Sequence, residues 1–413
     1  MGAAFMMVVV LAVLVNLLQM TGSDIMDTAE HEDGADAFFL AESAIEQAAA
    51  SWDSGTACVD LDGGVDTSFS EGTFSIDTAV LQTDGQCRVN VTGTVNSAVR
   101  KLQADLQRGC DTTGWIVGDS GTINRRISSS WSLSASTVST SLNAVHCVRK
   151  DNAWAVGESS VLLQWDGSVW GTVSSPVTAG FNGVHCVGED DCWAVGGTGS
   201  SGKIARLSGG TWSTSSAPAS TDWQAVYCVS SDDCWVVGGK GSNGFVIHWN
   251  GSSWSESTTP TSTIWLSVHC SGSSNCWVVG GKGNSGEAIQ WDGATWTEDA
   301  SISPSADTIW RGIYCVSNND CWLVGGKGGK GATLHWNGSA WSEVSNPVSD
   351  RWNSVHCVAT DDCWAAGDSG SSGSIIHWDG TSWSASTPAS SANWNGVHIT
   401  QPTAVIEWSE VVQ

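Results

Sequence analysis

Basic side chains are scarce in this 413-residue sequence. It has 16 Lys and Arg residues against 42 Asp and Glu residues, which gives a formal net charge of -26 at pH 7. Binding to the phosphates of DNA, RNA or anionic lipids needs clustered Lys and Arg. The composition therefore argues against nucleic acids and anionic membrane surfaces as partners.

Signatures of catalysis and cofactor binding are also missing. The sequence has no nucleophile elbow, no phosphate-binding glycine loop and no zinc motif. No loop has the dense oxygen ligands of a calcium site. We therefore predict no catalytic residue, no metal and no cofactor, and we expect that the protein is not an enzyme.

What the sequence does contain is a repeat. A Trp followed by two apolar residues and a Gly recurs seven times, at spacings of 39, 39, 42, 42, 45 and 42 residues. These anchor residues are Trp115, Trp154, Trp193, Trp235, Trp277, Trp322 and Trp364. A second Trp closes each copy, at Trp131, Trp170, Trp212, Trp254, Trp296, Trp341 and Trp383. This period is typical of β-propeller blades, so residues 110–413 are predicted to form a seven-bladed β-propeller.

Each copy contains several short strand-like runs. In the last copy, the runs 354–358, 363–366 and 374–378 are rich in β-branched and aromatic residues, and Asp, Ser and Gly separate them. Asp379-Gly380 is a pair that favours tight hairpins. One blade cannot bury both of its faces alone, so we expect the Trp pairs to fill the space between stacked blades.

The ends of the repeat region predict how the ring closes. Copies two to seven begin with a common phrase, such as Trp-Asn-Ser-Val-His-Cys at 352–357, which the first copy lacks. The phrase returns near the C-terminus at 394–399. We therefore predict that strand 394–399 completes the first blade. The sequence does not place the tail 404–413.

Cysteine spacing indicates disulfides. Five copies carry two Cys six positions apart, with turn-forming residues between them, and the pairs are Cys186 with Cys192, Cys228 with Cys234, Cys270 with Cys276, Cys315 with Cys321 and Cys357 with Cys363. A zinc site is the alternative, but successive pairs would lie a blade apart. Disulfides across hairpins indicate an oxidising compartment. Of the remaining cysteines, we pair Cys58 with Cys87 and, as the weaker inference, Cys110 with Cys147.

Two sets of residues are candidates for binding. A His or Tyr stands at one position in every copy: His146, His185, Tyr227, His269, Tyr314, His356 and His398. A metal site is one interpretation, but the exchange of His for Tyr favours repeated packing. We interpret His248, His335 and His377 in the same way. Aromatic residues before the first strand could stack on sugars if one rim exposed them, although blade packing is the favoured alternative. They are Phe181, Trp223, Trp265, Trp310, Trp352 and Trp394.

The N-terminal part differs from the repeats. Residues 2–20 are almost wholly apolar and long enough to span a bilayer as a helix. A secretory signal peptide is the alternative, although no basic segment precedes the run. Residues 27–51 continue with apolar residues at helical spacing. We expect a helix over 1–52, a small β region over 53–109 and the propeller over 110–413.

The apolar start and the phrase Ala-Phe-Phe-Leu-Ala-Glu-Ser-Ala-Ile-Glu-Gln at 37–47 resemble type IV pilins, and most closely minor pilins of the PilX and MshP kind. The acidic residue that most pilins have near the start of the helix is absent, because Phe5 or Met7 stands there. The resemblance implies a long pilin-type helix. Residues 1–51 of many copies would form the core of an extracellular filament, anchored in the inner membrane before assembly.

In that filament the propeller would be displayed for adhesion, biofilm formation or contact with matrix glycans. A minor pilin at a pilus tip, acting as a carbohydrate-binding adhesin, is the alternative. A propeller enzyme acting on polysaccharides is a less favoured one.

Overall fold

A computed structural model of the chain describes residues 28–53, 58–61, 67–69, 72–81, 87–107, 114–127, 129–149, 151–198, 201–241, 243–261, 263–283, 285–302, 308–327, 330–370, 372–400 and 404–410. The chain divides into two compact units. The first holds residues up to Val80, then Cys87–Asp105, and the C-terminal residues from Val405. The second holds nearly all of the segment from Leu106 to Ala404.

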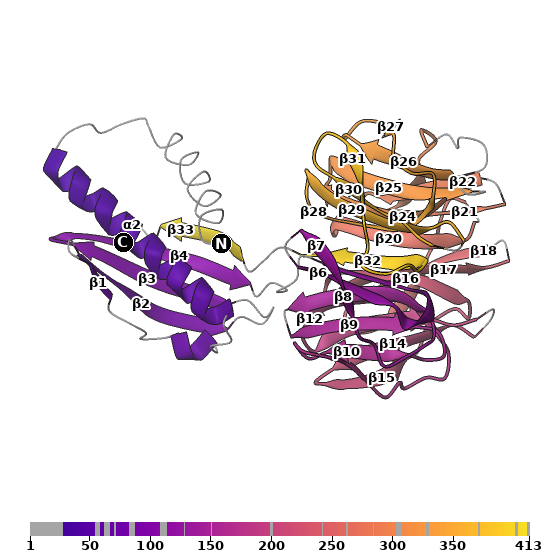
Figure 1. Cartoon of the computed structure of the whole chain (residues 1–413), viewed down its shortest axis with the longest axis horizontal. Coiled ribbons are helices and arrows are strands. Elements are labelled where there is room, and N and C mark those ends of the chain that lie inside the picture. Colours follow the sequence, from indigo (N-terminus) through magenta and orange to yellow (C-terminus); the bar gives the residue numbers. More distant parts are fainter. Residues whose placement is uncertain are drawn as a thin grey trace. The chain divides into compact units, whose positions relative to one another are not determined.

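The first unit is one helix on a five-stranded sheet (Figure 1). The strand order is β1-β2-β3-β4-β33. The elements are α2 (Thr28–Asp53), the 3-10 helix η1 (Cys58–Leu61), β1 (Thr67–Phe69), β2 (Gly72–Leu81), β3 (Cys87–Val95), β4 (Ala98–Gln107) and β33 (Ala404–Glu410). The C-terminal tail, which the sequence could not place, thus returns to this sheet beside β4.

Small residues bring α2 close to the sheet. Ala37, Ala41, Ala44 and Ala48 are fully buried on one face of the helix. Gly93 on β3 lies directly beneath, where a β-carbon would overlap the carbonyl oxygen of Ala37. The sequence spacing of three to four residues thus gives a narrow alanine stripe, and the chain covers that stripe with its own sheet.

The expected long N-terminal pilin helix is not found among the described residues. The only α-helix there is α2, which has 26 residues and begins at Thr28. Its buried alanine face packs on β3 of its own chain. The apolar run 2–20 lies outside the described residues. Among the helices that are described, none is both long enough and apolar enough to cross a membrane.

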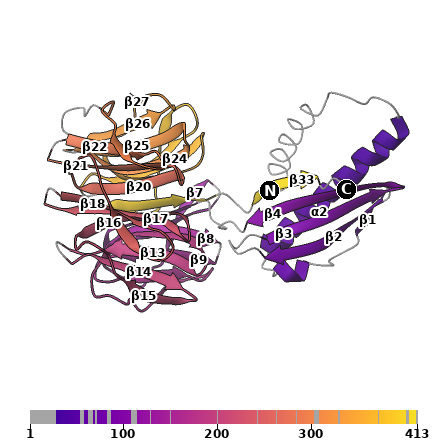
Figure 2. The ribbon, with the colours of Figure 1, turned by 180° about the vertical axis from the view of Figure 1, so that it is seen from behind.

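The second unit is a β-propeller of seven four-stranded sheets (Figures 1 and 2). Blade 1 is β32 (Trp394–Ile399), β5 (Gly114–Gly118), β6 (Ile123–Ile127) and β7 (Ser130–Ser134), with the 3-10 turn η2 (Asp119–Gly121). Blade 2 is β8 (Leu142–Arg149), β9 (Asn152–Gly157), β10 (Leu162–Trp165) and β11 (Trp170–Thr172). Blade 3 is β12 (Phe181–Gly188), β13 (Asp191–Gly196), β14 (Lys203–Ser208) and β15 (Thr211–Ser215).

The remaining four blades follow the same order. Blade 4 is β16 (Asp222–Ser230), β17 (Asp233–Lys240), β18 (Asn243–Trp249) and β19 (Trp254–Ser257). Blade 5 is β20 (Trp265–Gly272), β21 (Asn275–Lys282), β22 (Ser285–Trp291) and β23 (Trp296–Glu298). Blade 6 is β24 (Ile309–Ser317), β25 (Asp320–Lys327), β26 (Lys330–Trp336) and β27 (Trp341–Glu343). Blade 7 is β28 (Arg351–Ala359), β29 (Asp362–Asp368), β30 (Ile375–Trp378) and β31 (Trp383–Ser386).

The ring closes through the predicted strand. β32 pairs antiparallel with β5, with His398 opposite Trp115. The first strands of neighbouring blades contact each other all round the ring, including β28 with β32 and β32 with β8. The last strand before the tail therefore belongs to the first blade, as the displaced phrase predicted. Such closure joins both ends of the repeat region in one sheet.

Tryptophans fill the seams between blades, as expected. Trp322 of blade 6 packs edge-on against Trp383 of blade 7, with ring centroids 4.9 Å apart, and lies 4.7 Å from Trp378. The same arrangement joins most neighbouring blades. At the seam between blades 7 and 1, Arg126 lies 4.4 Å over the Trp364 ring, at the position that Trp378 has in blade 7. A cation over an indole face can substitute for the aromatic contact there.

Candidate functional site

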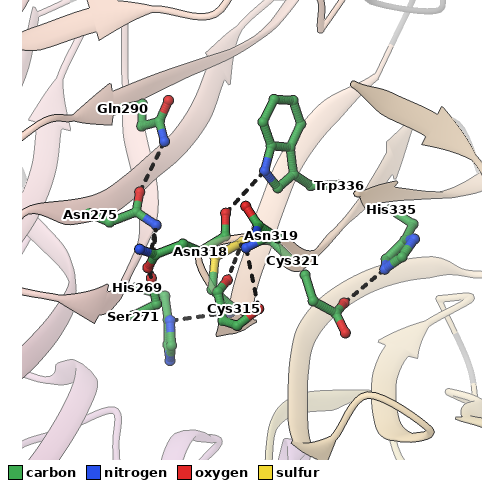
Figure 3. Close-up of a disulfide and its surroundings, with 12 residues drawn as sticks. His269, Ser271, Asn275, Gln290, Cys315, Asn318, Asn319, Cys321, His335 and Trp336 are labelled. Carbon is green, nitrogen blue, oxygen red and sulfur yellow. Dashed lines mark hydrogen bonds and ion pairs between the residues drawn. A yellow bond between two sulfur atoms is a disulfide. The ribbon is translucent and has the colours of Figure 1, made fainter. Parts of the chain in front are cut away.

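One end of the blades carries the disulfides, in the hairpins between the first and second strands. We call this end the stapled end. Cys315 and Cys321 stand directly opposite each other on β24 and β25 and are bonded (Figure 3). The other four pairs predicted at a spacing of six are also disulfides, and they are Cys186 with Cys192, Cys228 with Cys234, Cys270 with Cys276 and Cys357 with Cys363. The bond between Cys58 and Cys87 in the first unit is confirmed as well.

These disulfides are structural and offer no site to a ligand. The second cysteine of each staple is fully buried, with 0% of its surface exposed, at Cys192, Cys234, Cys276, Cys321 and Cys363. Each lies on a second strand, at the core between neighbouring blades, and its sulfur is already bonded across the hairpin. Cys147 is also disulfide-bonded, whereas Cys110, its predicted partner, lies outside the described residues.

Seven side chains from the first strands form a closed ring, which we call the inner ring. Its members are the residues singled out in the sequence: His146, His185, Tyr227, His269, Tyr314, His356 and His398. Ring centroids of neighbours are 4.1 to 4.6 Å apart, and the last member closes on the first. The residues that resembled a metal site do lie side by side. Whether their histidines could bind a metal ion depends on their tautomer and their protonation.

Hydrogen bonding fixes the tautomer of the inner-ring histidines. The backbone N–H of Cys315 donates to Nδ1 of His269, at 3.2 Å (Figure 3). Equivalent bonds run from Cys228 to His185, from Cys147 to His398 and from Ile399 to His356. Because Nδ1 accepts a hydrogen bond, it carries no proton, and the proton of the neutral ring is on Nε2. Nε2 then has no lone pair for a metal ion.

Burial keeps these imidazoles neutral. It lowers the pKa of His146 to about 4 and the pKa of His269 to about 3. Burial, together with the other histidines of the ring, holds the pKa values of His185, His356 and His398 well below their ordinary range. Within the described residues, no three or more His, Cys, Asp or Glu side chains are grouped to hold a metal ion. The inner ring is therefore a packing feature that every blade repeats.

The second histidine set has partners in its own blade. His335 on β26 (Figure 3) hydrogen-bonds Asp320 at 2.8 Å. Its ring also lies over the Trp322 ring, with the two centroids 4.6 Å apart. His248 and His377 bond Asp233 and Asp362 in the same way. Other blades make this contact with different residues, through Arg206 with Asp191 and Gln290 with Asn275. A basic side chain faces Asp in blades 3, 4, 6 and 7, and Gln faces Asn in blade 5, so the pair is a structural device that each of these blades satisfies.

The candidate ligand-stacking rim is not exposed, and the favoured interpretation of these aromatic residues, blade packing, is confirmed. Phe181, Trp223, Trp265, Trp310, Trp352 and Trp394 are all between 0 and 1% exposed. Glycines of the neighbouring blade cover the five tryptophans: a β-carbon at Gly286 would lie 2.6 Å from Nε1 of Trp310, and Gly244 stands in the same relation to Trp265. These aromatic residues fill the body of the propeller and offer no face to a sugar.

The sequence analysis missed a set of residues at the opposite end of the blades. In blades 4 to 6, the hairpin between the second and third strands has three more residue pairs than in blades 2 and 7, for example Gly238 with Phe245 and Lys240 with Asn243. Each longer hairpin ends in lysine, at Lys240, Lys282 and Lys327 with Lys330. We call β17–β18, β21–β22 and β25–β26 the lysine hairpins. The phrase Gly-Gly-Lys-Gly, present at 238–241, 280–283 and 325–328, could have revealed them.

Comparisons with known proteins bear on the fold. No protein-family profile matches the chain, and no curated protein matches it in sequence. Solved structures do match. YCF48 bound to a D1 peptide has a TM-score of 0.51 at 17% identity, over 67% of this chain and 93% of that chain. YCF48 from Cyanidioschyzon merolae has a TM-score of 0.50 at 16% sequence identity, and the match covers 66% of this chain and 94% of that chain. A protein from Lactobacillus plantarum has a TM-score of 0.55 at 10% sequence identity, and the match covers 70% of this chain and 99% of that chain.

These comparisons show the fold alone. This chain carries a multi-bladed β-propeller. The comparisons find propellers and give no evidence for a pilin, and the described helix has 26 residues against the 52 of the helix that the sequence implied. The pilin resemblance is therefore corrected. The Ala- and Glu-rich phrase that suggested it describes an amphipathic helix, and such a helix can pack on the sheet of its own chain.

Proposed function

We propose that this chain is an exported binding protein whose propeller recognises a partner without transforming it. The observation that supports this most is the uniform chemistry of the blades. The groups that could act as acids, bases or ligands recur from blade to blade and bond to each other, as His335 does with Asp320. An enzyme needs one place where such groups are arranged for a reacting atom.

Export is supported by the disulfides. Five hairpins of six-residue spacing are closed by disulfides, and a further disulfide lies in the first unit. Such bonds form and persist in oxidising compartments. We therefore propose an extracellular location. The filament and pilus-tip hypotheses depended on the pilin resemblance, so we do not extend the proposal to either.

The partner class is a surface or matrix glycan. The propeller offers a broad surface for extended ligands, as repeated folds do. The acidic composition argues against nucleic acid, because the chain would repel phosphates over most of its surface. A glycan makes no such demand for dense positive charge.

A glycan array and a turnover assay on the full-length chain test this proposal together. We expect saturable binding to at least one class of glycan and no change in the length of that glycan after prolonged incubation. Turnover that a single substitution abolishes would contradict the proposal and establish a propeller enzyme acting on polysaccharides. An array without any binding would contradict the choice of a glycan partner.

A further inference from the structure

The lysine hairpins are confined to one sector of the propeller. They belong to three consecutive blades, and Lys203 extends the row to blade 3. Figures 1 and 2 show the ends of β17–β18 and β21–β22 reaching the same side of the propeller. Blades 1, 2 and 7 lack such lysines on their described hairpins. Since the rest of the ring repeats its chemistry, this sector is where the ring is least uniform.

The lysines of these hairpins are accessible to a ligand. Lys240, Lys282 and Lys330 are all exposed. Each sits at the last paired position of its two strands, so its backbone is held by that pairing. Gly241 and Gly283, which follow Lys240 and Lys282, have φ values of +67° and +63°, and a β-carbon there would meet open space. A ligand could therefore approach the backbone closely between one lysine and the next.

Charge favours an anionic ligand at this sector. The acidic residues beside the lysine hairpins, Asp222, Glu287 and Asp350, are only partly exposed. The exposed glutamates of these blades lie on the fourth strands, opposite the middle of the third strands, and they are Glu256, Glu298 and Glu343. On a chain of net charge -26, a row of exposed lysines is thus a local exception. Such a row attracts anions.

Arginines elsewhere in the propeller are held by carboxylates of the chain. Arg206 pairs with Asp191 at the stapled end, and Arg351 pairs with Asp368 in blade 7. Arg149 pairs with both Asp151 and Glu189. These pairs consume positive charge within the fold, whereas the side chains of Lys240, Lys282 and Lys330 are exposed to solvent.

The surroundings of the lysines argue against a folded protein as partner. Protein interfaces are anchored by aromatic or aliphatic side chains that become buried. The large apolar side chains that are exposed in the described part of the chain are Phe39, Val80, Val99, Ile127, Leu133, Val169 and Val229. All of these lie outside the lysine hairpins. A hydrophilic ligand with regularly spaced charges suits this sector better.

Charge density separates the polyanions. Duplex DNA carries one negative charge per about 1.7 Å of its axis, and its binding needs dense clusters of Lys and Arg. The lysine hairpins offer only one or two lysines per blade. A carboxylated polysaccharide carries one charge per acidic sugar and presents hydroxyl groups between them. We propose that the lysine hairpins form a docking surface for a linear acidic polysaccharide. This inference rests on the proposed function and names its ligand class.

The experiment compares three full-length variants with the natural chain, with polygalacturonate as the probe and dextran as the neutral control polymer. The test variant is Lys240→Gln/Lys282→Gln/Lys330→Gln. The matched control, Arg88→Gln/Arg100→Gln/Lys101→Gln, removes the same positive charge from the first unit. Lys240→Arg/Lys282→Arg/Lys330→Arg keeps the charge at the hairpins. Thermal melting verifies that each variant is folded.

We expect the natural chain to bind polygalacturonate and not dextran. The glutamine variant should lose about tenfold in affinity, because the loss of three exposed ion pairs gives a change of that order. The matched control should change affinity by less than about twofold. The arginine variant should bind like the natural chain. The affinity of the glutamine variant should also depend less steeply on salt concentration than that of the natural chain.

Several outcomes would overturn the inference. Equal affinity of the glutamine variant and the matched control would show that the lysine hairpins do not bind the polymer. Tighter binding of poly-glutamate or duplex DNA than of polygalacturonate would assign the surface to another class of polyanion. Binding of neutral glycans alone would leave the proposed function standing and remove this ligand class. Cleavage of polygalacturonate would instead contradict the proposed function.

Discussion

The two ends of the propeller blades follow different rules. At the stapled end, five of the seven blades carry the same disulfide, and the pair across the second and third strands is matched in each case, a basic side chain with Asp or Gln with Asn. At the other end, only blades 4 to 6 have lysine hairpins among the described strands. Uniform chemistry serves the architecture that every blade shares, and chemistry confined to one sector is where recognition can be specific. Four measurements can break or sharpen this comparison.

The largest effect is expected in the uniform part of the ring. Trp322 is fully buried and packs on Trp378 and Trp383 of the next blade. Trp322→Ala should lower the free energy of unfolding by about 3 to 5 kcal/mol, because it removes the ring and leaves a cavity at the seam. Chemical denaturation measures this. Leu133→Ala is the control, since Leu133 is 64% exposed and should change stability by less than about 0.5 kcal/mol. A small loss at Trp322 would mean that the seams are not tightly packed.

The disulfides of the stapled end should have a smaller effect. The loop closed by Cys315 and Cys321 spans only six residues, so its closure removes little freedom from the unfolded chain. Replacing both cysteines by Ala should cost about 2 kcal/mol on the loop-entropy scale. The loop closed by Cys58 and Cys87, with a separation of 29, should cost about 3.5 kcal/mol on that scale. Denaturant unfolding of the two double variants without reductant checks the order. A larger loss at Cys315 and Cys321 would indicate that the staple also holds the hairpin in shape.

The inner ring should make stability depend on pH. Its histidines have lowered pKa values in the folded chain, so the unfolded chain binds more protons as the pH falls below the ordinary value of about 6.5. Stability is therefore complete above that pH and is lost as the pH falls, down to about 4 for His146. His146→Tyr uses the residue that blades 4 and 6 carry, and it should reduce the slope by up to about 1.4 kcal/mol per pH unit. Unfolding at several pH values tests this. His335→Gln serves as the control, because His335 lies outside the inner ring. An unchanged slope for His146→Tyr would show that this histidine takes up its proton at the same pH in the folded chain as in the unfolded chain.

Much of this architecture could be predicted from the sequence because the blade sequence motif repeats seven times. The period set the number of blades, the displaced phrase at 394–399 set the closing strand, and the spacing of six set the staples. Burial of the strand-start aromatics could not be predicted in the same way. The cover of Trp310 is Gly286 of the neighbouring blade, so it depends on contacts between blades. The lysine hairpins were missed because only three of the seven copies contain the Gly-Gly-Lys-Gly sequence. A comparison of the residues that all copies share does not reveal a feature of three copies.

The N-terminal unit shows a second limit of sequence patterns. The alanine stripe on α2 has the same spacing whether another copy or the chain's own sheet covers it. Gly93 on β3 allows the chain's own sheet to cover the stripe, because it has no β-carbon to collide with Ala37. Gly93 lies far along the sequence from Ala37, so the helix sequence alone does not reveal this contact. The tail strand β33 is a second example. It lies beside β4 in the same sheet, although the whole propeller separates the two strands in the sequence.

The smallest effect on stability is expected at the lysine hairpins. Lys282 is exposed at the end of β21, opposite Ser285, so its side chain contributes little to the folded state. Lys282→Gln should change the free energy of unfolding by less than about 0.5 kcal/mol, because surface positions away from special contacts usually change it by no more than that. Equilibrium unfolding in denaturant measures this, and Trp322→Ala in the same assay supplies the opposite extreme. A loss of more than about 1 kcal/mol would place Lys282 among the residues that hold the blade together, and the two ends of the blades would then no longer differ in kind. If stability is unchanged while the triple glutamine variant loses its ligand, the chain keeps the packing of its blades and the recognition of its partner on separate residues. That separation is what lets one sector of a repeated ring vary without unfolding the rest.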